Sequence, residues 1–178
     1  LGVVPGASAA NTVTFRSQSS DTSRVRLQYA ATTSAGNYVV RLDGTDHVAF
    51  EHLSLRAAGT GTFARVVLLT GQLDGVVFRN DRFESRTVNW VSWDERVALY
   101  GAGVRTTGLR VENSRFTNGE GGIYVTAPSN SVGNGTVVTG NVFEQTGGNA
   151  YSSAVYLTYH DHVEIRQNTM AGFNDTIE

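Results

Sequence analysis

Short runs in which apolar and polar residues alternate recur along the chain, and alternation with a step of two predicts β-strands that bury one face. Each run closes on a large apolar residue, at intervals of 28, 28, 33, 27 and 27 residues. These closing residues are Leu27, Leu55, Phe83, Phe116, Phe143 and Met170. Five residues earlier, the last five runs carry a second apolar column, which comprises Phe50, Phe78, Val111, Val138 and Ile165. A repeat of this length is typical of solenoids, in which stacked coils share one continuous core.

A third apolar column with nearly the same period indicates a further strand in each repeat. It comprises Phe15, Leu42, Leu68, Leu99, Val125 and Leu157, and a Val or Ile stands two residues before each of them. Such β-branched side chains are stiff and favour strands. No window sustains apolar residues at the helical spacing of i, i+3, i+4 and i+7. We therefore predict a parallel β-solenoid of about six coils, which forms a single all-β domain over residues 1–178.

Polar residues also align when the chain is divided into coils, and this supports the predicted register. One outward column places opposite charges on neighbouring coils and comprises Glu51, Arg79, Glu112, Thr139 and Arg166. Another column places Arg56 beside Glu84. At one corner, turn-forming residues recur at Asp46, Asp74, Thr107, Asn134 and Asp161. At a second corner, two adjoining columns are expected to form a hydrogen-bonded ladder of side-chain amides. The first comprises His52, Asn80, Asn113, Gly140 and Gln167, and the second comprises Leu53, Asp81, Ser114, Asn141 and Asn168.

The motif VxFxNxxF, in which Asn stands at the turn between two strands, describes a repeat that covers residues 12–173. In this motif the chain resembles the right-handed parallel β-helix repeats of pectate-lyase-like proteins. Residues 12–57 look like the β-helix modules of large secreted or surface proteins of Bacteroidota-type bacteria. The resemblance implies a right-handed parallel β-helix in a protein that is secreted or displayed on the cell surface. It is specific for the fold rather than for the function, because one fold serves many functions.

Composition excludes several classes of function. All 14 basic residues are Arg, and 16 acidic residues bring the net charge to −2, so we expect no nucleic-acid partner. The absence of Lys excludes Schiff-base and P-loop chemistry in this chain, and the absence of Cys excludes disulfides. No run approaches the roughly 18 apolar residues of a membrane span, so we expect no membrane insertion.

The two ends of the sequence suggest a segment of a longer protein. The chain starts at Leu1, and its last five residues, NDTIE, begin a further strand pattern. A solenoid cut within a coil has unpaired strand edges, and such edges favour association. We therefore expect end-to-end packing with neighbouring β-helix coils.

Two acidic residues on neighbouring coils are the candidates for a metal site. Asp46 and Asp74 are followed in their column by Thr107, and two carboxylates at a turn with carbonyl oxygens would suit Ca²⁺. The alternative is that these side chains stabilise the turns by hydrogen bonds to the backbone. Because only these two acids of the column lie on neighbouring coils, we expect no metal and no other cofactor.

The longest repeat interval contains an inserted loop, residues 85–97, that concentrates aromatic and charged side chains. Loops on a rigid scaffold often carry function, and Trp beside carboxylates is typical of a sugar-binding surface. The alternative is that the indoles cover the flank of the solenoid as a local cap. Two Tyr residues on adjacent coils would flank the loop. The candidate glycan-binding residues are Trp90, Trp93, Asp94, Glu95, Tyr124 and Tyr156.

Two functions of different classes fit these observations. The first is a non-catalytic structural or adhesive module of a secreted or cell-surface bacterial protein. The second is a carbohydrate-binding or carbohydrate-active β-helix, which as an enzyme would be a polysaccharide lyase or a glycoside hydrolase. Pectate lyases use clustered acids with a basic residue, and polygalacturonase-like hydrolases use three close Asp residues. No predicted coil of this chain shows either arrangement, so no catalytic residue is assigned and the first function is favoured.

Overall fold

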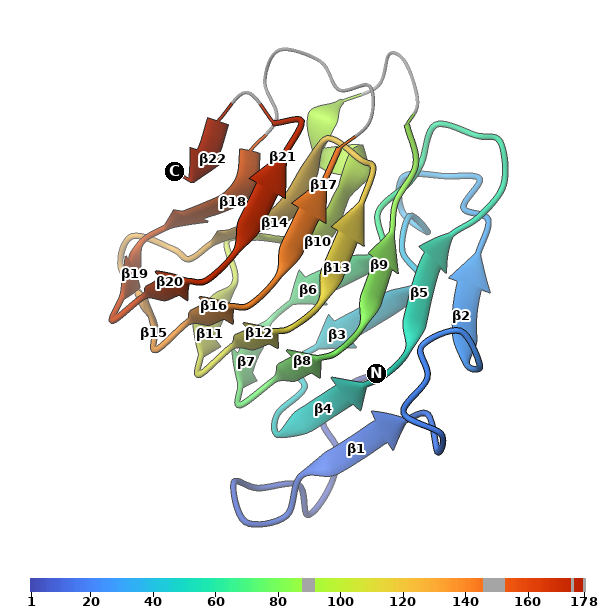
Figure 1. The fold of residues 1–178 in the computed structure, drawn as a ribbon. Coiled ribbons are helices and arrows are strands. Elements are labelled where there is room, and N and C mark those ends of the chain that lie inside the picture. Colours follow the sequence, from blue (N-terminus) through green and yellow to red (C-terminus); the bar gives the residue numbers. More distant parts are fainter. Residues whose placement is uncertain (88–91, 146–152, 174, 178) are drawn as a thin grey trace.

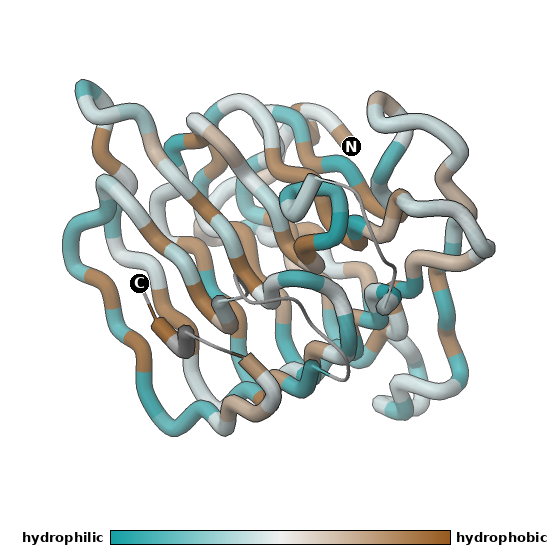
Figure 2. The backbone as a smooth tube through the Cα atoms, turned by 90° about the horizontal axis from the view of Figure 1, so that it is seen from above, coloured by the Kyte–Doolittle hydropathy of each residue, from teal (hydrophilic) through white to brown (hydrophobic). Residues whose placement is uncertain are grey.

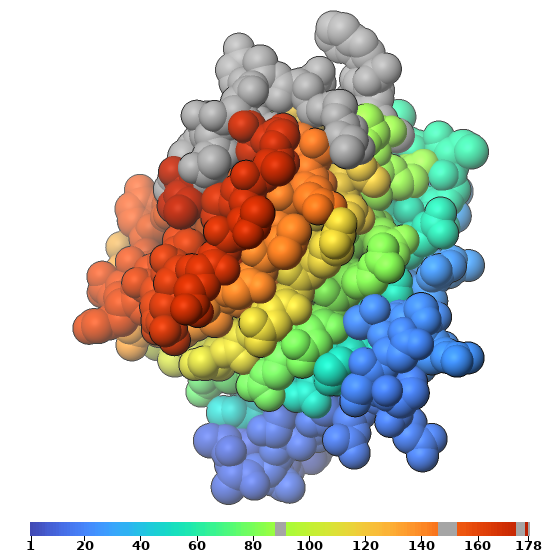
Figure 3. Space-filling model, viewed as in Figure 1, coloured from blue at the N-terminus to red at the C-terminus, as the bar shows by residue number. Residues whose placement is uncertain are grey.

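The computed structural model describes residues 1–87, 92–145, 153–173 and 175–177, and in it the chain winds into a parallel β-solenoid (Figure 1). Successive coils are stacked in sequence order, from the N-terminal to the C-terminal end (Figure 3). Three sheets contain six strands each, and a smaller sheet contains four. Six stacked strands span about five turns of the chain, and this confirms the all-β solenoid predicted from the repeat.

Each complete coil passes in order through four sheets, which are numbered here 1 to 4. Sheet 1 consists of β1 (Val13–Arg16), β4 (Val48–Glu51), β8 (Val77–Arg79), β12 (Arg110–Glu112), β16 (Val137–Thr139) and β20 (Glu164–Arg166). Sheet 2 consists of β2 (Arg26–Tyr29), β5 (Ser54–Ala57), β9 (Arg82–Glu84), β13 (Arg115–Thr117), β17 (Val142–Glu144) and β21 (Thr169–Ala171). Sheet 3 consists of β3 (Val40–Asp43), β6 (Val67–Thr70), β10 (Val97–Ala102), β14 (Gly121–Thr126), β18 (Ser153–Thr158) and β22 (Asp175–Ile177). Sheet 4 consists of β7 (Gln72–Asp74), β11 (Arg105–Thr107), β15 (Gly133–Asn134) and β19 (His160–Asp161).

A short 3-10 helix, η1 (Trp93–Arg96), directly precedes β10. Within the described ranges, no helix is long and apolar enough to cross a membrane.

The register of sheets 1 and 2 confirms the columns predicted from the sequence. Successive partners in sheet 1 are Phe15, Phe50, Phe78, Val111, Val138 and Ile165. Successive partners in sheet 2 are Leu27, Leu55, Phe83, Phe116, Phe143 and Met170. Away from the two ends of the solenoid, these side chains are at most 3% exposed. Apolar residues accordingly recur at equivalent places on neighbouring coils (Figure 2).

The third predicted column is wrong at its first and third members. Phe15 belongs to sheet 1, where it pairs with Phe50. In sheet 3, Leu42 pairs with Leu69, which is buried, rather than with Leu68. The four residues 66–69 are all apolar, so alternation there cannot distinguish the inward side chain from the outward one.

The prediction is also wrong where the inserted loop enters sheet 3. Leu99 pairs with Val67 and with Ile123, whereas the sequence alignment placed it beside Val125. The loop changes the number of residues between β9 and β10, so the period counted elsewhere does not hold at this point. A shift of this kind moves outward side chains to different neighbours.

The corner between sheets 1 and 2 contains a ladder along the second of the two predicted columns, from Leu53 to Asn168, whereas in the first column His52 Nε2 and Asn80 Nδ2 lie 3.5 Å apart. The side-chain oxygen of each member after Leu53 accepts a hydrogen bond from the backbone N–H of the member one coil earlier. The N to O distances are 2.8, 3.0, 2.9 and 2.8 Å for the pairs Leu53–Asp81, Asp81–Ser114, Ser114–Asn141 and Asn141–Asn168. The residue before each member adopts a positive φ between 48° and 67°: His52, Asn80, Asn113, Gly140 and Gln167. The ladder thus satisfies buried backbone donors at a sharp turn.

Apolar side chains are exposed at both ends of the solenoid. Phe15 and Leu27 on the first coil are 42% and 39% exposed. Near the other end, Val163 is 40% exposed, and Asp175–Ile177 adds a further strand to sheet 3, in line with the strand pattern expected there. End-to-end packing against further coils stays a prediction.

Candidate functional site

The turn η1 contacts β10 and β14 of sheet 3. Glu95 anchors it, because the Glu95 carboxylate accepts a hydrogen bond from Asn37 Nδ2 at 2.6 Å and the Glu95 carbonyl accepts one from the same nitrogen at 2.7 Å. Arg96 forms a buried ion pair with Glu120 at 2.9 Å. These contacts fix the C-terminal half of the turn to the solenoid, and they leave Trp93 at its outer end.

Four aromatic side chains on the outer face of sheet 3 form what we call the aromatic strip: Trp93, Tyr100, Tyr124 and Tyr156. The three Tyr rings stack along the solenoid, with centroids 5.4 Å apart for Tyr100 and Tyr124 and 4.6 Å apart for Tyr124 and Tyr156. Trp93 meets Tyr100 and Tyr124 edge-on, at 6.4 and 4.7 Å. Trp93 is 41% exposed, so the strip presents an indole and a row of phenols at the surface.

Arg65 supports the strip from one side. Its guanidinium carbon lies 4.1 Å from the centroid of the Tyr100 ring, a cation–π contact. The same guanidinium donates to the carbonyl of Asp94 at 2.8 Å and lies 3.4 Å from the Asp94 carboxylate. Burial lowers the pKa of Arg65, and the carboxylates of Glu95 and Asp94 oppose this shift. This buried cation therefore links Asp94 of η1 to Tyr100 of β10.

The phenols of Tyr100 and Tyr124 are neutral hydrogen-bonding groups at physiological pH. Burial raises the pKa of Tyr100, and the carboxylate of Asp94 adds to the increase. Burial also raises the pKa of Tyr124, as do the neighbouring rings of Tyr156 and Tyr100. A neutral phenol both donates and accepts hydrogen bonds. Next to an exposed indole, such groups can contact the apolar face and the hydroxyl groups of a sugar.

The structure brings together only some of the residues predicted for this site. Trp93, Tyr124 and Tyr156 lie in one strip, and Asp94 stands at its border. Glu95 faces away, since its carboxylate is occupied by Asn37 and by Ser34 Oγ. Trp90 lies outside the described residues.

Sequence reasoning missed Tyr100 and Arg65. The alignment of Leu99 with Val125 moved Tyr100 out of the column of Tyr124, although these two Tyr residues pair directly. Counting 24 residues back from Tyr124, instead of assuming a constant period, would have found Tyr100. Arg65 precedes β6 as a single charge before an apolar run, and no sequence signal connects it with Asp94.

The two candidate metal ligands serve the corner of the solenoid. Asp46 Oδ1 accepts a hydrogen bond from the backbone N–H of Asp74 at 2.8 Å. Asp74 lies 4.0 Å from His47 Nε2 and opposite Thr107 in sheet 4. In the part of the chain that the structure describes, no three His, Asp or Glu residues converge in a way that could hold a metal ion. The geometry agrees with the turn-stabilising alternative.

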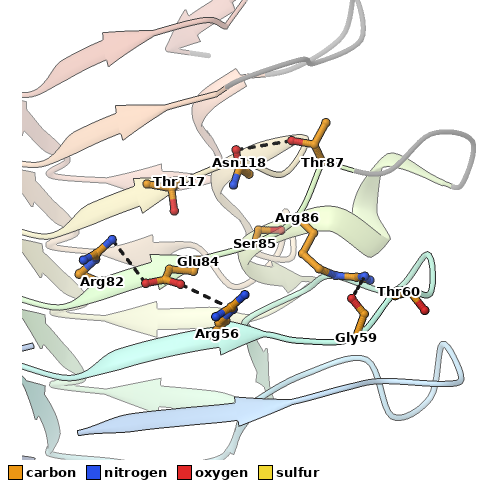
Figure 4. A pocket seen from close by; sticks show the side chains of 10 residues that line it. All are labelled: Arg56, Gly59, Thr60, Arg82, Glu84, Ser85, Arg86, Thr87, Thr117 and Asn118. Atoms are coloured by element: carbon orange, nitrogen blue, oxygen red, sulfur yellow. Dashed lines mark hydrogen bonds and ion pairs between the residues drawn. The ribbon is translucent and has the colours of Figure 1, made fainter. Parts of the chain in front are cut away.

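A groove of about 770 Å³ lies over sheet 2 and the loops that follow β5 and β9 (Figure 4). In this groove the carboxylate of Glu84 lies between two guanidinium groups, 3.8 Å from that of Arg56 and 3.5 Å from that of Arg82. Arg86 donates instead to backbone carbonyls, at 2.5 Å to Gly59 and at 3.0 Å to Phe63. The groove is polar and positively charged, but its guanidiniums already have protein partners that an anionic ligand would have to replace.

Comparisons with protein-family models, with curated proteins and with solved structures found no match for this chain. The parallel β-solenoid therefore rests on the structure itself. The resemblance to pectate-lyase-like proteins and to modules of Bacteroidota-type bacteria stays an expectation.

Proposed function

We propose that the chain is a non-catalytic module of a secreted or cell-surface bacterial protein, in which the stacked coils form a rigid scaffold with an adhesive surface. The observation that carries this proposal is the use of outward charges to join coils. Arg79 lies 3.3 Å from Glu51 on the preceding coil and 2.9 Å from Glu112 on the following one. Networks of this kind stabilise more than isolated surface pairs do, and they stiffen the stack.

The non-catalytic part of the proposal is tested by a depolymerisation screen on the intact chain. Neutral and acidic polysaccharides are incubated with the protein, and reducing ends and unsaturated sugars are measured over time. We expect neither to increase above the rate without protein. An increase of either product would overturn the assignment and favour a glycoside hydrolase or a polysaccharide lyase.

A second candidate function, carbohydrate binding, is favoured by the aromatic strip. The indole of Trp93 lies at the surface, and the buried contacts of Glu95 and Arg96 fix the turn that carries it before any ligand binds. A preorganised aromatic surface loses little conformational entropy when a ligand binds. The ligand would be a polysaccharide or a cell-surface glycan, which stacks on the indole and bonds to the phenols of Tyr100 and Tyr124.

This candidate is tested on a glycan array with two matched variants. Trp93→Ala removes the indole of the strip, whereas Tyr29→Ala removes an aromatic ring that is 49% exposed on sheet 2. We expect the first variant to lose at least about tenfold in affinity, about 1.4 kcal/mol, and the second to bind like the parent chain. Equal binding by both variants would show that the strip is not the site.

A further inference from the structure

Asp81 is the one carboxylic acid in the side-chain ladder among the described coils. The other members with polar side chains are Ser114, Asn141 and Asn168, which are neutral. Asp81 is 1% exposed, and its Oδ1 accepts the N–H of Leu53 at 2.8 Å. Its Oδ2 is buried and has no hydrogen-bond partner among the described residues. A buried, ionised carboxylate oxygen without a hydrogen-bond donor destabilises the fold, so this position favours the protonated acid.

The equivalent residues on later coils show what the second side-chain atom does at this position. Asn141 Nδ2 donates to the backbone carbonyl of Val111 at 2.9 Å, and Asn168 Nδ2 donates to that of Val138 at 2.9 Å. In both cases the acceptor is the sheet 1 column residue of the preceding coil. For Asp81 the corresponding residue is Phe50, since Phe50 precedes Phe78 in the same column. An ionised Oδ2 would face this carbonyl as a second acceptor, whereas a protonated one would supply the missing donor.

We propose that Asp81 is protonated in the folded solenoid and donates a hydrogen bond from Oδ2 to the carbonyl of Phe50, so that its ionisation loosens the corner between these two coils. The stability of the corner at Asp81 thereby depends on pH. The protonated acid takes the place that a side-chain amide holds on the later coils.

The charged groups around this corner favour the same state. Glu51 on β4 and Arg79 on β8 form an ion pair at 3.3 Å, and Arg79 also pairs with Glu112 on β12. His52, at the corner one coil earlier, lies 3.5 Å from the amide of Asn80 and is also titratable. The guanidinium nearest in sequence, that of Arg82 on β9, is paired with Glu84 in sheet 2. The cations near this corner are therefore engaged with other carboxylates.

The electrostatics agree with this geometry. Burial raises the pKa of Asp81 from 3.8 to about 7, the backbone N–H groups of Leu53 and Arg79 oppose the shift, and Glu51 adds to it. A carboxyl with a higher pKa in the folded chain than in the unfolded chain stabilises the fold fully below the unfolded value. This contribution is lost as the pH rises from about 4 to about 7. The corner at Asp81 is thus more stable in acidic solution than in alkaline solution.

The test is a carbon NMR titration of the side-chain carboxyls in the intact chain. We expect one Asp signal, absent in Asp81→Asn, with a midpoint near 7. We also expect the Leu53 amide to exchange with solvent faster in the parent chain than in Asp81→Asn at about pH 8, above the folded pKa, but not at about pH 5. A midpoint in the ordinary Asp range, or equal exchange of Leu53 in both proteins in alkaline solution, would overturn the proposal.

A second variant separates the effect of the ladder position from that of the residue. Asn141→Asp places a carboxyl at the equivalent site two coils after Asp81, with the Nδ2 of Asn141 replaced by an oxygen that faces Val111. The introduced carboxyl is expected to titrate well above the usual range of an aspartic acid. A normal titration of this carboxyl would show that the position does not impose protonation.

Discussion

Two aromatic stacks run along the same solenoid with nearly the same spacing but opposite surroundings. In the core, Phe83, Phe116 and Phe143 have centroid distances of 4.3 and 4.7 Å. On the outer face of sheet 3, the Tyr rings of the strip are 5.4 and 4.6 Å apart. The rung spacing of parallel strands imposes both stacks. The direction of the side chain decides whether a stack contributes burial or presents chemical groups at the surface.

The largest expected effect in this comparison is the loss of an inner ring. Phe116→Ala removes a side chain that is 1% exposed and contacts rings on both neighbouring coils. The lost burial and the remaining cavity should lower the free energy of unfolding by about 3–5 kcal/mol. Denaturant unfolding measures this change, with Thr117→Ala on the outer face as control. A loss below about 1 kcal/mol would contradict the assignment of this column to the core.

An intermediate effect is expected where the outer stack is tied to the scaffold. Glu95→Ala removes the carboxylate acceptor of the buried Asn37 amide, leaves the backbone carbonyl as the other acceptor, and should cost about 1–3 kcal/mol. Because Glu95 fixes η1, the indole of Trp93 should become more exposed. Tryptophan fluorescence, read against Thr117→Ala on sheet 2, measures this shift. An unchanged emission spectrum with full stability would rule out the anchoring role.

The smallest effect is expected from the outer ring itself. Tyr124→Ala removes the central phenol of the strip, which is half-buried and stacked on both sides. The loss of aromatic contacts should cost only about 0.5–1.5 kcal/mol, because little core volume changes. Thermal unfolding beside Phe116→Ala gives the comparison directly. If both variants lose the same stability, the two stacks do not differ in the way described here.

The sequence predicts sheets 1 and 2 well because their strands are short and their intervals are almost constant. Phe78 and Phe83, five residues apart, fix two columns at once, and the corner between them contains a turn residue in every coil. The polar ladder followed from the same register, with Asn141 and Asn168 as its clearest members.

Sheet 3 and the candidate site were harder to predict because their side chains are set by contacts outside the repeat. The position of Trp93 depends on Glu95 reaching Asn37, a contact between residues 58 positions apart. Tyr100 depends on a register that the inserted loop had changed. No alternation pattern contains either fact, so the strip was only partly predicted.

The ladder at the corner gives the solenoid a direction. Asp81, Ser114 and Asn141 each receive a hydrogen bond from the coil before and give their own N–H to the coil after, whereas Leu53 only gives. The backbone donor of a coil is therefore satisfied by its successor and not by its predecessor. Duplication of one whole repeat would reproduce both bonds at each new junction, while a partial coil that displaced the corner would separate the oxygen from its donor at the junction where it is inserted. The ladder is therefore compatible with lengthening or shortening of the solenoid by whole coils.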